Sequence, residues 1–194
     1  MNMTIATYDA RAAEYARMSK TLHELPEMEA FVALLPDGAR LLDLGCGPGQ
    51  YAEWFANHGC AVEALDASAE MVKLAAARPG ISARQARFED LPAAPTYDAV
   101  WANFSLLHIP RAELPGHLKR IKRALKPAGL LHLGMKLGTG EATDALGRFY
   151  AYWSEEELEQ MLLETGFTIT ARRHGKGVGL AGSVDSYILI RAHG

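Results

Sequence analysis

The sequence predicts an α/β fold in which helices cover both faces of a mostly parallel β-sheet. Short apolar runs alternate with longer amphipathic stretches along most of the chain. Alternation at this pace is typical of βαβ units, because parallel strands need a helical crossover between them. The apolar runs expected to form these strands are residues 40–44, 61–65, 81–86, 97–102 and 129–135.

The remaining elements follow from helical periodicity and a capping signal. Three stretches between the strands have apolar residues at helical spacing: residues 51–58, 68–77 and about 113–125. Ser154 and Glu157 match a capping box, which predicts a further helix that runs to Gly166. Two last strands are expected at residues 167–171 and 187–190, and only a short glycine-rich loop at residues 175–182 is expected between them. They should therefore run antiparallel to each other.

The length of 194 residues suits a single domain spanning residues 1–194. Two weaker helical segments, residues 5–18 and 26–35, precede the first strand. We interpret residues 1–38 as a helical lid across the ends of the strands, although segments of this kind can also cap a core.

Composition argues against several classes of partner. The net charge is −3 at pH 7 and no basic run occurs, whereas a nucleic-acid surface needs clustered Lys and Arg. No signal peptide or membrane span is recognisable, so we expect a cytoplasmic protein that binds no membrane. Cys46 and Cys60 lie outside any metal-ligand spacing, and no metal site is expected. The sequence leaves open whether the protein is a monomer or a homodimer.

A glycine-rich turn at residues 43–50 (DLGCGPGQ) follows the first strand. Glycine permits positive φ and a close approach of backbone to ligand, and the helix that follows presents free N–H groups. A dinucleotide fingerprint would place its third glycine at position 50, where this chain has Gln50. Asp43 is poorly placed beside a pyrophosphate, but it suits the amino group of methionine, directly or through water. The alternative is a turn that needs glycine only for its own geometry. That alternative explains one of the three glycines more easily than all three.

Asp66 follows the second strand, about twenty residues after the turn. A carboxylate at this point accepts hydrogen bonds from ribose hydroxyls, which indicates an adenosine-type ligand, although NAD would use the same group. The alternative is a solvated acid near the start of the next helix. Together with the glycine turn, the ribose interpretation is favoured.

Several blocks of the sequence resemble, in order, the class I S-adenosylmethionine-dependent methyltransferase family. After the turn and Asp66 these blocks are residues 88–92 (FEDLP), 97–103 (YDAVWAN) and 125–130 (LKPAGL). The resemblance runs from about residue 39 to 136, and small bacterial members of the tellurite-resistance type are the most similar. It implies a three-layer Rossmann-like sandwich whose sheet has seven strands, the last of them antiparallel. It also implies S-adenosyl-L-methionine as cofactor, S-adenosyl-L-homocysteine as product and a small-molecule acceptor.

The resemblance implies a role for each cofactor-binding residue. The turn lines the methionine half of the cofactor, Asp66 takes the ribose, Phe88 and Glu89 meet the adenine, and Asn103 faces the sulfonium. The expected cofactor-binding set is Asp43, Gly45, Cys46, Gly47, Gly49, Asp66, Ala67, Met71, Phe88, Glu89 and Asn103.

His108 is the one candidate catalytic residue. It follows the fourth strand, where it can act as a base or line the substrate pocket, or else bond to the backbone and shape the loop. Asn103 is followed by Phe104 and Ser105, so the Asn- or Asp-Pro-Pro-aromatic tetrad of enzymes that methylate adenine or glutamine nitrogens is missing. No such specialised chemistry is expected.

Substrate-facing candidates come from the lid and from the segment after the fifth strand. Tyr8 and Tyr15 resemble lid residues of small-molecule members, unless their helix is an ordinary amphipathic one. The family places substrate-recognition insertions at residues 137–153, where Arg148 and Tyr150 are the best candidates.

Three neighbours of these candidates have a simpler interpretation beside the functional one. Phe149 and Trp153 are expected to pack beneath the following helix, as aromatic residues just before a capped helix often do. Lys136, at the end of the fifth strand, meets an anionic group or is merely solvated.

The sequence therefore predicts direct in-line methyl transfer to an unidentified small molecule. Two alternatives remain open at this stage: a non-catalytic module that binds S-adenosylmethionine, and a nicotinamide-dependent oxidoreductase, which the glycine spacing disfavours.

Overall fold

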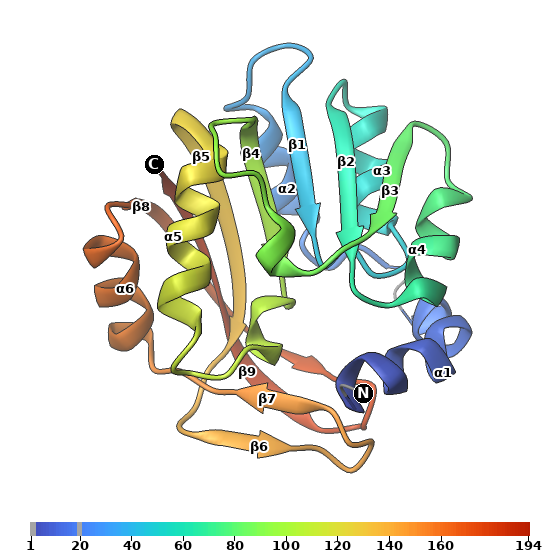
Figure 1. Cartoon of the computed structure of the whole chain (residues 1–194). Coiled ribbons are helices and arrows are strands. Elements are labelled where there is room, and N and C mark those ends of the chain that lie inside the picture. The colour runs from blue at the N-terminus through green and yellow to red at the C-terminus, as the bar shows by residue number, and fades with distance from the viewer. Residues whose placement is uncertain (1–2, 19–20) are drawn as a thin grey trace.

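A seven-stranded sheet forms the centre of the computed structural model, which describes residues 3–18 and 21–194 (Figure 1). Its strands lie in the order β3-β2-β1-β4-β5-β9-β8. They are β1 (Arg40–Leu44), β2 (Ala61–Asp66), β3 (Ile81–Gln85), β4 (Tyr97–Asn103), β5 (Leu125–Lys136), β8 (Thr168–Val178) and β9 (Val184–His193). The pairs from β3 to β5 are parallel, and β9 runs antiparallel to both β5 and β8. The predicted sheet, mostly parallel with an antiparallel last strand, is confirmed.

Helices cover both faces of this sheet (Figure 1). On one face, α5 (Leu114–Ala124) and α6 (Glu155–Glu164) bury leucines such as Leu118 and Leu158. The other face is covered by α2 (Leu25–Val32), α3 (Gln50–Asn57) and α4 (Ala69–Ala76). Ser154 and Glu157 form the predicted capping box at the start of α6.

Successive residues of each central strand enter the two cores in turn, because side chains alternate between the faces of a sheet. In β1, Leu42 and Leu44 belong to the core under α5, whereas Leu41 belongs to the core under α3. β4 behaves in the same way, with Trp101 fully buried on the α3 side. Strands that are buried on both faces are typical of parallel sheets.

The C-terminal hairpin is longer than expected. The sequence places a loop at residues 175–182, but β8 continues to Val178 and β9 begins at Val184. Gly175 pairs with Tyr187, and a Cβ on this glycine would lie 2.3 Å from the tyrosine ring. Gly175 therefore makes room for a tyrosine on the neighbouring strand instead of breaking the strand.

Residues 137–153 form a two-stranded ribbon beside the end of the sheet. The ribbon pairs β6 (Glu141–Thr143) with β7 (Phe149–Ala151) in antiparallel fashion. An isolated bridge between Leu137 and Trp153 joins the two chain segments that flank the ribbon. Sequence periodicity does not reveal strands of three residues, and the ribbon was not expected.

Strand order reverses between β1 and β4, which places a crevice at their carboxyl ends, where open α/β sheets bind ligands. The helix α1 (Met3–Met18), with a kink at Arg11, lies at this end of the sheet (Figure 1). The part of the expected lid at residues 1–2 and 19–20 lies outside the described residues. None of the helices in the described part of the chain has the length and apolar character needed to cross a bilayer.

Candidate active site

The glycine turn after β1 is shaped by contacts that exclude larger residues. Gly45 has φ +77°, and a Cβ there would lie 2.2 Å from the Cβ of Ser105. Gly49 is the left-handed residue that begins α3, and a Cβ there would lie 2.9 Å from Ala75. The backbone N–H groups of Gly45 and its neighbour both donate to Leu65 O, which holds the turn against β2. The turn therefore keeps its bare backbone toward the crevice.

Asp66, at the end of β2, joins this turn to the start of α4. Its Oδ2 accepts the N–H of Gly47 at 2.9 Å and its Oδ1 accepts the N–H of Ser68 at 2.8 Å. Burial raises the pKa of Asp66 above its usual range, although these two hydrogen bonds act in the opposite direction. A carboxylate has about four lone-pair positions, so acceptor capacity remains for a ligand beside it.

Asp43 is buried behind the turn, with 2 % of its surface exposed. Its Oδ2 has no hydrogen-bond partner among the described residues. Burial, and then the charge of Asp66, raises the pKa of Asp43 to about 8. A buried carboxylate without a counter-charge is costly, and a cationic group bound nearby would offset that cost.

The helix α1 is bonded to both sides of the crevice. On the α4 side, Asp9 Oδ1 accepts hydrogen bonds from Ser68 Oγ at 2.6 Å and Glu70 N–H at 3.2 Å. On the side of the ribbon, Thr4 Oγ1 accepts the N–H of Phe149 at 2.9 Å. The cavity residues contributed by α1 are Thr4, Ile5, Tyr8 and Tyr15. Of the two helices predicted for the lid, α1 lies over the cavity, whereas α2 packs against the sheet and lines no part of it. The lid at residues 1–38 stays a prediction.

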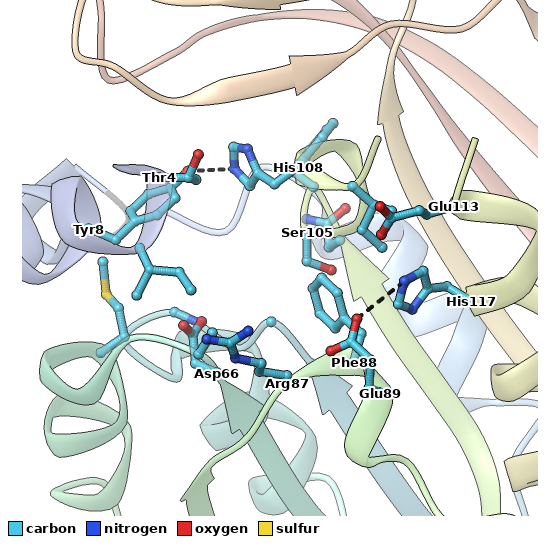
Figure 2. A pocket seen from close by; sticks show the side chains of 18 of the residues that line it. Thr4, Tyr8, Asp66, Arg87, Phe88, Glu89, Ser105, His108, Glu113 and His117 are labelled. Carbon is cyan, nitrogen blue, oxygen red and sulfur yellow. Dashed lines mark hydrogen bonds and ion pairs between the residues drawn. The ribbon is translucent and has the colours of Figure 1, made fainter. Parts of the chain in front are cut away.

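His108 lies across the cavity from Asp66 and close to Tyr8 (Figure 2). Its Nδ1 is 2.6 Å from the carbonyl oxygen of Phe149, which can only accept, so Nδ1 carries the proton. Nε2 is then the acceptor for the Tyr8 hydroxyl at 2.9 Å. Burial lowers the pKa of His108 to about 4. The imidazole is therefore neutral near pH 7, and both of its nitrogens are already hydrogen-bonded.

The opposite end of the cavity is formed by η1 (Phe88–Asp90) and by His117 of α5 (Figure 2). His117 Nε2 lies 3.5 Å from Glu89 Oε1, and the ring of Phe88 meets the imidazole edge-on at 6.0 Å between centroids. Burial lowers the pKa of His117. This end offers an apolar face beside carboxylate and imidazole groups, which suits a flat heterocycle with polar edges.

These elements enclose one cavity of about 210 Å³. The predicted site residues that line it are Tyr8, Tyr15, Gly45, Gly47, Asp66, Ala67, Met71, Phe88, Glu89, Asn103 and His108. Those that lie outside its lining are Asp43, Cys46, Gly49, Lys136, Arg148 and Tyr150.

Three of the residues outside the lining belong to the turn region and three to the expected substrate side. Burial and the charge of Asp43 raise the pKa of Cys46, which makes its thiol inert.

Arg148 is 2 % exposed and pairs with Asp144 at 2.7 Å. Lys136 Nζ pairs with Asp185 at 2.7 Å and lies 3.9 Å from the ring centre of Tyr150. Lys136 is therefore held in an internal ion pair and is not merely solvated, and its proposed role toward a substrate stays a prediction.

Several lining residues were not singled out from the sequence: Thr4, Ile5, Arg87, Phe104, Ser105, Ile109, Pro110, Glu113 and His117. Most of them adjoin predicted residues, in the lid or in the segment after β4, so position alone could have found them. Glu113 and His117 carry no such signal, since a charged or polar residue at the start of a helix is ordinary.

Part of the chain matches a protein-family model. The model described as "Methyltransferase domain" matches residues 41–129. This range includes the glycine turn, Asp66, Phe88 and His108.

Curated relatives cover more of the chain. Malonyl-[acyl-carrier protein] O-methyltransferase of Enterobacter lignolyticus is 34 % identical over 155 residues, which is 77 % of this chain and 58 % of that protein. Ubiquinone biosynthesis O-methyltransferase of Xanthomonas axonopodis pv. citri is 37 % identical over 124 residues, or 59 % of this chain and 51 % of that protein. The chain thus spans about half the length of the curated relatives it matches.

Solved structures share the fold. The 1,6-didemethyltoxoflavin-N1-methyltransferase of Burkholderia thailandensis, solved with its methyl acceptor and S-adenosylhomocysteine, aligns with a TM-score of 0.79 and 21 % identity. The alignment covers 98 % of this chain and 87 % of that one. The narrower resemblance to the tellurite-resistance type stays a prediction.

Proposed function

Because the chain belongs to the class I S-adenosylmethionine-dependent methyltransferases, we propose that it transfers a methyl group from this cofactor to a small molecule bound beneath α1. The observation that carries the proposal is the single cavity that joins Gly45, Gly47, Asp66 and Phe88 to the aromatic residues of the lid. The acceptors named for its relatives are of several kinds: malonyl-acyl-carrier protein, trans-aconitate and a ubiquinone precursor. The acceptor of this chain is therefore open to experiment.

The residues of the cavity fit the cofactor. Gly45 and Gly47 line the cavity, where the absence of side chains lets the methionine portion lie against the backbone. Asp66 retains acceptor capacity for a ribose diol, and Phe88 offers an apolar face to adenine. Asp43, whose Oδ2 has no partner among the described residues, would balance the ammonium of the methionine moiety, directly or through water.

S-adenosylmethionine supplies an activated methyl group: a lone pair of the acceptor forms a bond to the methyl carbon while the carbon–sulfur bond breaks and sulfur keeps its electron pair, which yields S-adenosylhomocysteine. The protein's contribution is to hold the acceptor in line and to exclude water. Tyr8, Tyr15 and Phe104 present aromatic groups to a cationic centre in this cavity. The hydrogen bonds of α1 to both sides of the crevice close it over the reactants.

His108 is not placed as a free base in this closed arrangement. Its Nδ1–H is bonded to Phe149 O and its Nε2 accepts from Tyr8, so no lone pair faces the acceptor directly. We infer that His108 positions Tyr8, and that an acceptor which must lose a proton gives it to water or to a group of its own.

Two measurements test the proposal. Calorimetric titration with S-adenosylhomocysteine should give saturable 1:1 binding, whereas NADH should not bind. A screen of small acceptors for release of S-adenosylhomocysteine, followed by mass spectrometry, should then detect a product heavier by one methyl group in place of hydrogen. Binding of NADH alone would contradict the cofactor assignment, and binding of S-adenosylhomocysteine without turnover on any acceptor would favour a non-catalytic binding module.

A further inference from the structure

The part of the cavity that faces the lid has a wall of aromatic rings. We call this the aromatic wall and define it as Tyr8, Tyr15, Phe104 and His108, all of which line the cavity. The rings of Tyr8 and Tyr15 meet edge-on at 5.6 Å between centroids, and those of Tyr8 and His108 at 5.5 Å. In Figure 2, Tyr8 and His108 lie across the cavity from Asp66 and Phe88, the residues proposed to hold ribose and adenine. The acceptor must therefore bind between the cofactor and this wall.

The polar side-chain atoms of Tyr8 and His108 are already hydrogen-bonded within the protein. Arg148 Nη1 donates to the Tyr8 oxygen at 3.1 Å, and the Tyr8 hydroxyl donates to His108 Nε2. His108 in turn donates from Nδ1 to Phe149 O. This chain of hydrogen bonds has a single direction, and it holds His108 neutral. It leaves the imidazole unable to donate to an anion.

The cations behind the wall are paired within the protein. Arg148 donates to Asp144 from Nε at 2.9 Å and from Nη2 at 2.7 Å, while Lys136 pairs with Asp185. Neither cation lines the cavity. The cation that does line it, Arg87, lies beside Asp66 on the opposite side (Figure 2). Within the described part of the chain, the aromatic wall therefore offers no unpaired positive charge.

From this geometry we propose that the acceptor is a neutral, flat molecule that packs on the aromatic wall, and that carboxylate-bearing molecules are rejected. An anion placed there would lose its hydration without gaining a cationic or N–H partner from the protein. A flat neutral ring keeps the aromatic contacts and makes no such demand. The proposal rests on the proposed function, because it takes the remainder of the cavity to be filled by the cofactor.

The test compares matched amide and carboxylate probes on protein saturated with S-adenosylhomocysteine. We would use benzamide and benzoate, cinnamamide and cinnamate, and 2-naphthamide and 2-naphthoate, with affinities from saturation-transfer NMR and calorimetry. The amide of at least one pair should bind at least tenfold more tightly than its carboxylate, roughly the effect of 1.4 kcal/mol. Equal or tighter binding of the carboxylates, or failure of every amide to bind, overturns the proposal.

A charge variant makes the test independent of which ring fits best. Asp185→Asn removes the partner of Lys136, and it should raise carboxylate affinity relative to amide affinity by severalfold. Asp98→Asn is the matched control, because it removes a carboxylate that pairs with Lys126 at 2.8 Å on another part of the chain and does not line the cavity. The proposal fails if a carboxylate binds the wild-type protein and Asp185→Asn leaves the ratio of carboxylate affinity to amide affinity unchanged. Lys136 would then not be what decides charge selectivity.

Different results contradict the proposed function and the acceptor proposal. A protein that does not bind S-adenosylhomocysteine fails the proposed function before any probe is added. A protein that binds it but prefers carboxylates fails only the acceptor proposal.

Discussion

Replacing Asp66 by asparagine tests the ribose assignment at the level of single atoms. The carboxylate already accepts one backbone N–H on each oxygen, from Gly47 at 2.9 Å and from Ser68 at 2.8 Å. Asparagine has one acceptor oxygen, so its amide N–H₂ must face one of these donors or one ribose hydroxyl. The variant is thus expected to lose at least one charge-assisted hydrogen bond in the complex.

The size of the loss follows from the strength of such bonds. A hydrogen bond to a charged group contributes about 1.5–3 kcal/mol. At about 1.4 kcal/mol for each factor of ten, S-adenosylhomocysteine should bind roughly 10- to 100-fold more weakly to Asp66→Asn. Calorimetric titration measures this directly, with Asp98→Asn as the control for loss of a paired carboxylate that does not line the cavity.

A ligand-side comparison separates a direct contact from a disturbed turn. The 2′,3′-dideoxy analogue of S-adenosylhomocysteine lacks both hydroxyls, so wild-type protein should bind it much more weakly than the parent compound. Asp66→Asn should show a smaller difference between the two ligands, because the contact is already impaired. Additive losses, or unchanged affinity in a folded variant, would refute the assignment.

Three further predictions concern the turn and the buried charges. The pKa of about 8 at Asp43 means that the folded protein keeps a proton which the unfolded chain releases near pH 4, so stability without cofactor should fall as pH rises from about 4 to 8. Asp43→Asn should flatten this slope in denaturant titrations. Gly45→Ala should lower the free energy of unfolding by about 1–2 kcal/mol for its positive φ alone and should block binding of S-adenosylhomocysteine. Adding Ser105→Gly to this variant should recover the part of the stability lost to the clash with Ser105, but not the part lost to the backbone conformation. Arg148→Met should destabilise by roughly 3 kcal/mol because Asp144 loses its buried partner, and thermal unfolding should show a smaller loss when Asp144→Asn is added.

Sequence periodicity was enough for the parts of the fold that repeat. The first five strands and the helices between them follow one alternation, and each strand carries enough apolar residues to be recognised. The hairpin of β8 and β9 was underestimated because Gly175 and Gly177 suggest a loop when read alone. Their partner Tyr187 is several residues away in sequence, and only the pairing explains why glycine is needed there.

The residues of the candidate site also differ in whether a sequence pattern reveals them. Asp66 and Gly47 could be related from the sequence because both lie in one βαβ unit, at the end of β2 and in the turn after β1, and a unit of this kind has a recognisable pattern. His117 was not, since it reaches the cavity from α5 through a contact with Glu89 on another segment. Residues brought in from a distant helix leave no pattern in a single sequence.

Arg148 shows how contacts that appear only in the folded protein change the chemical role inferred for a residue. An arginine among aromatic residues indicates an anion site when the rest of the fold is unknown. Asp144, four residues earlier, accepts two hydrogen bonds from its guanidinium, and Tyr8 from the N-terminal helix accepts a third. With three of its five N–H groups engaged and 2 % of its surface exposed, Arg148 has little left with which to bind a substrate. Its charge instead fixes the orientation of Tyr8 and, through Tyr8, of His108. A residue predicted to meet a planar or anionic substrate thus becomes part of the reason that the wall carries no free charge.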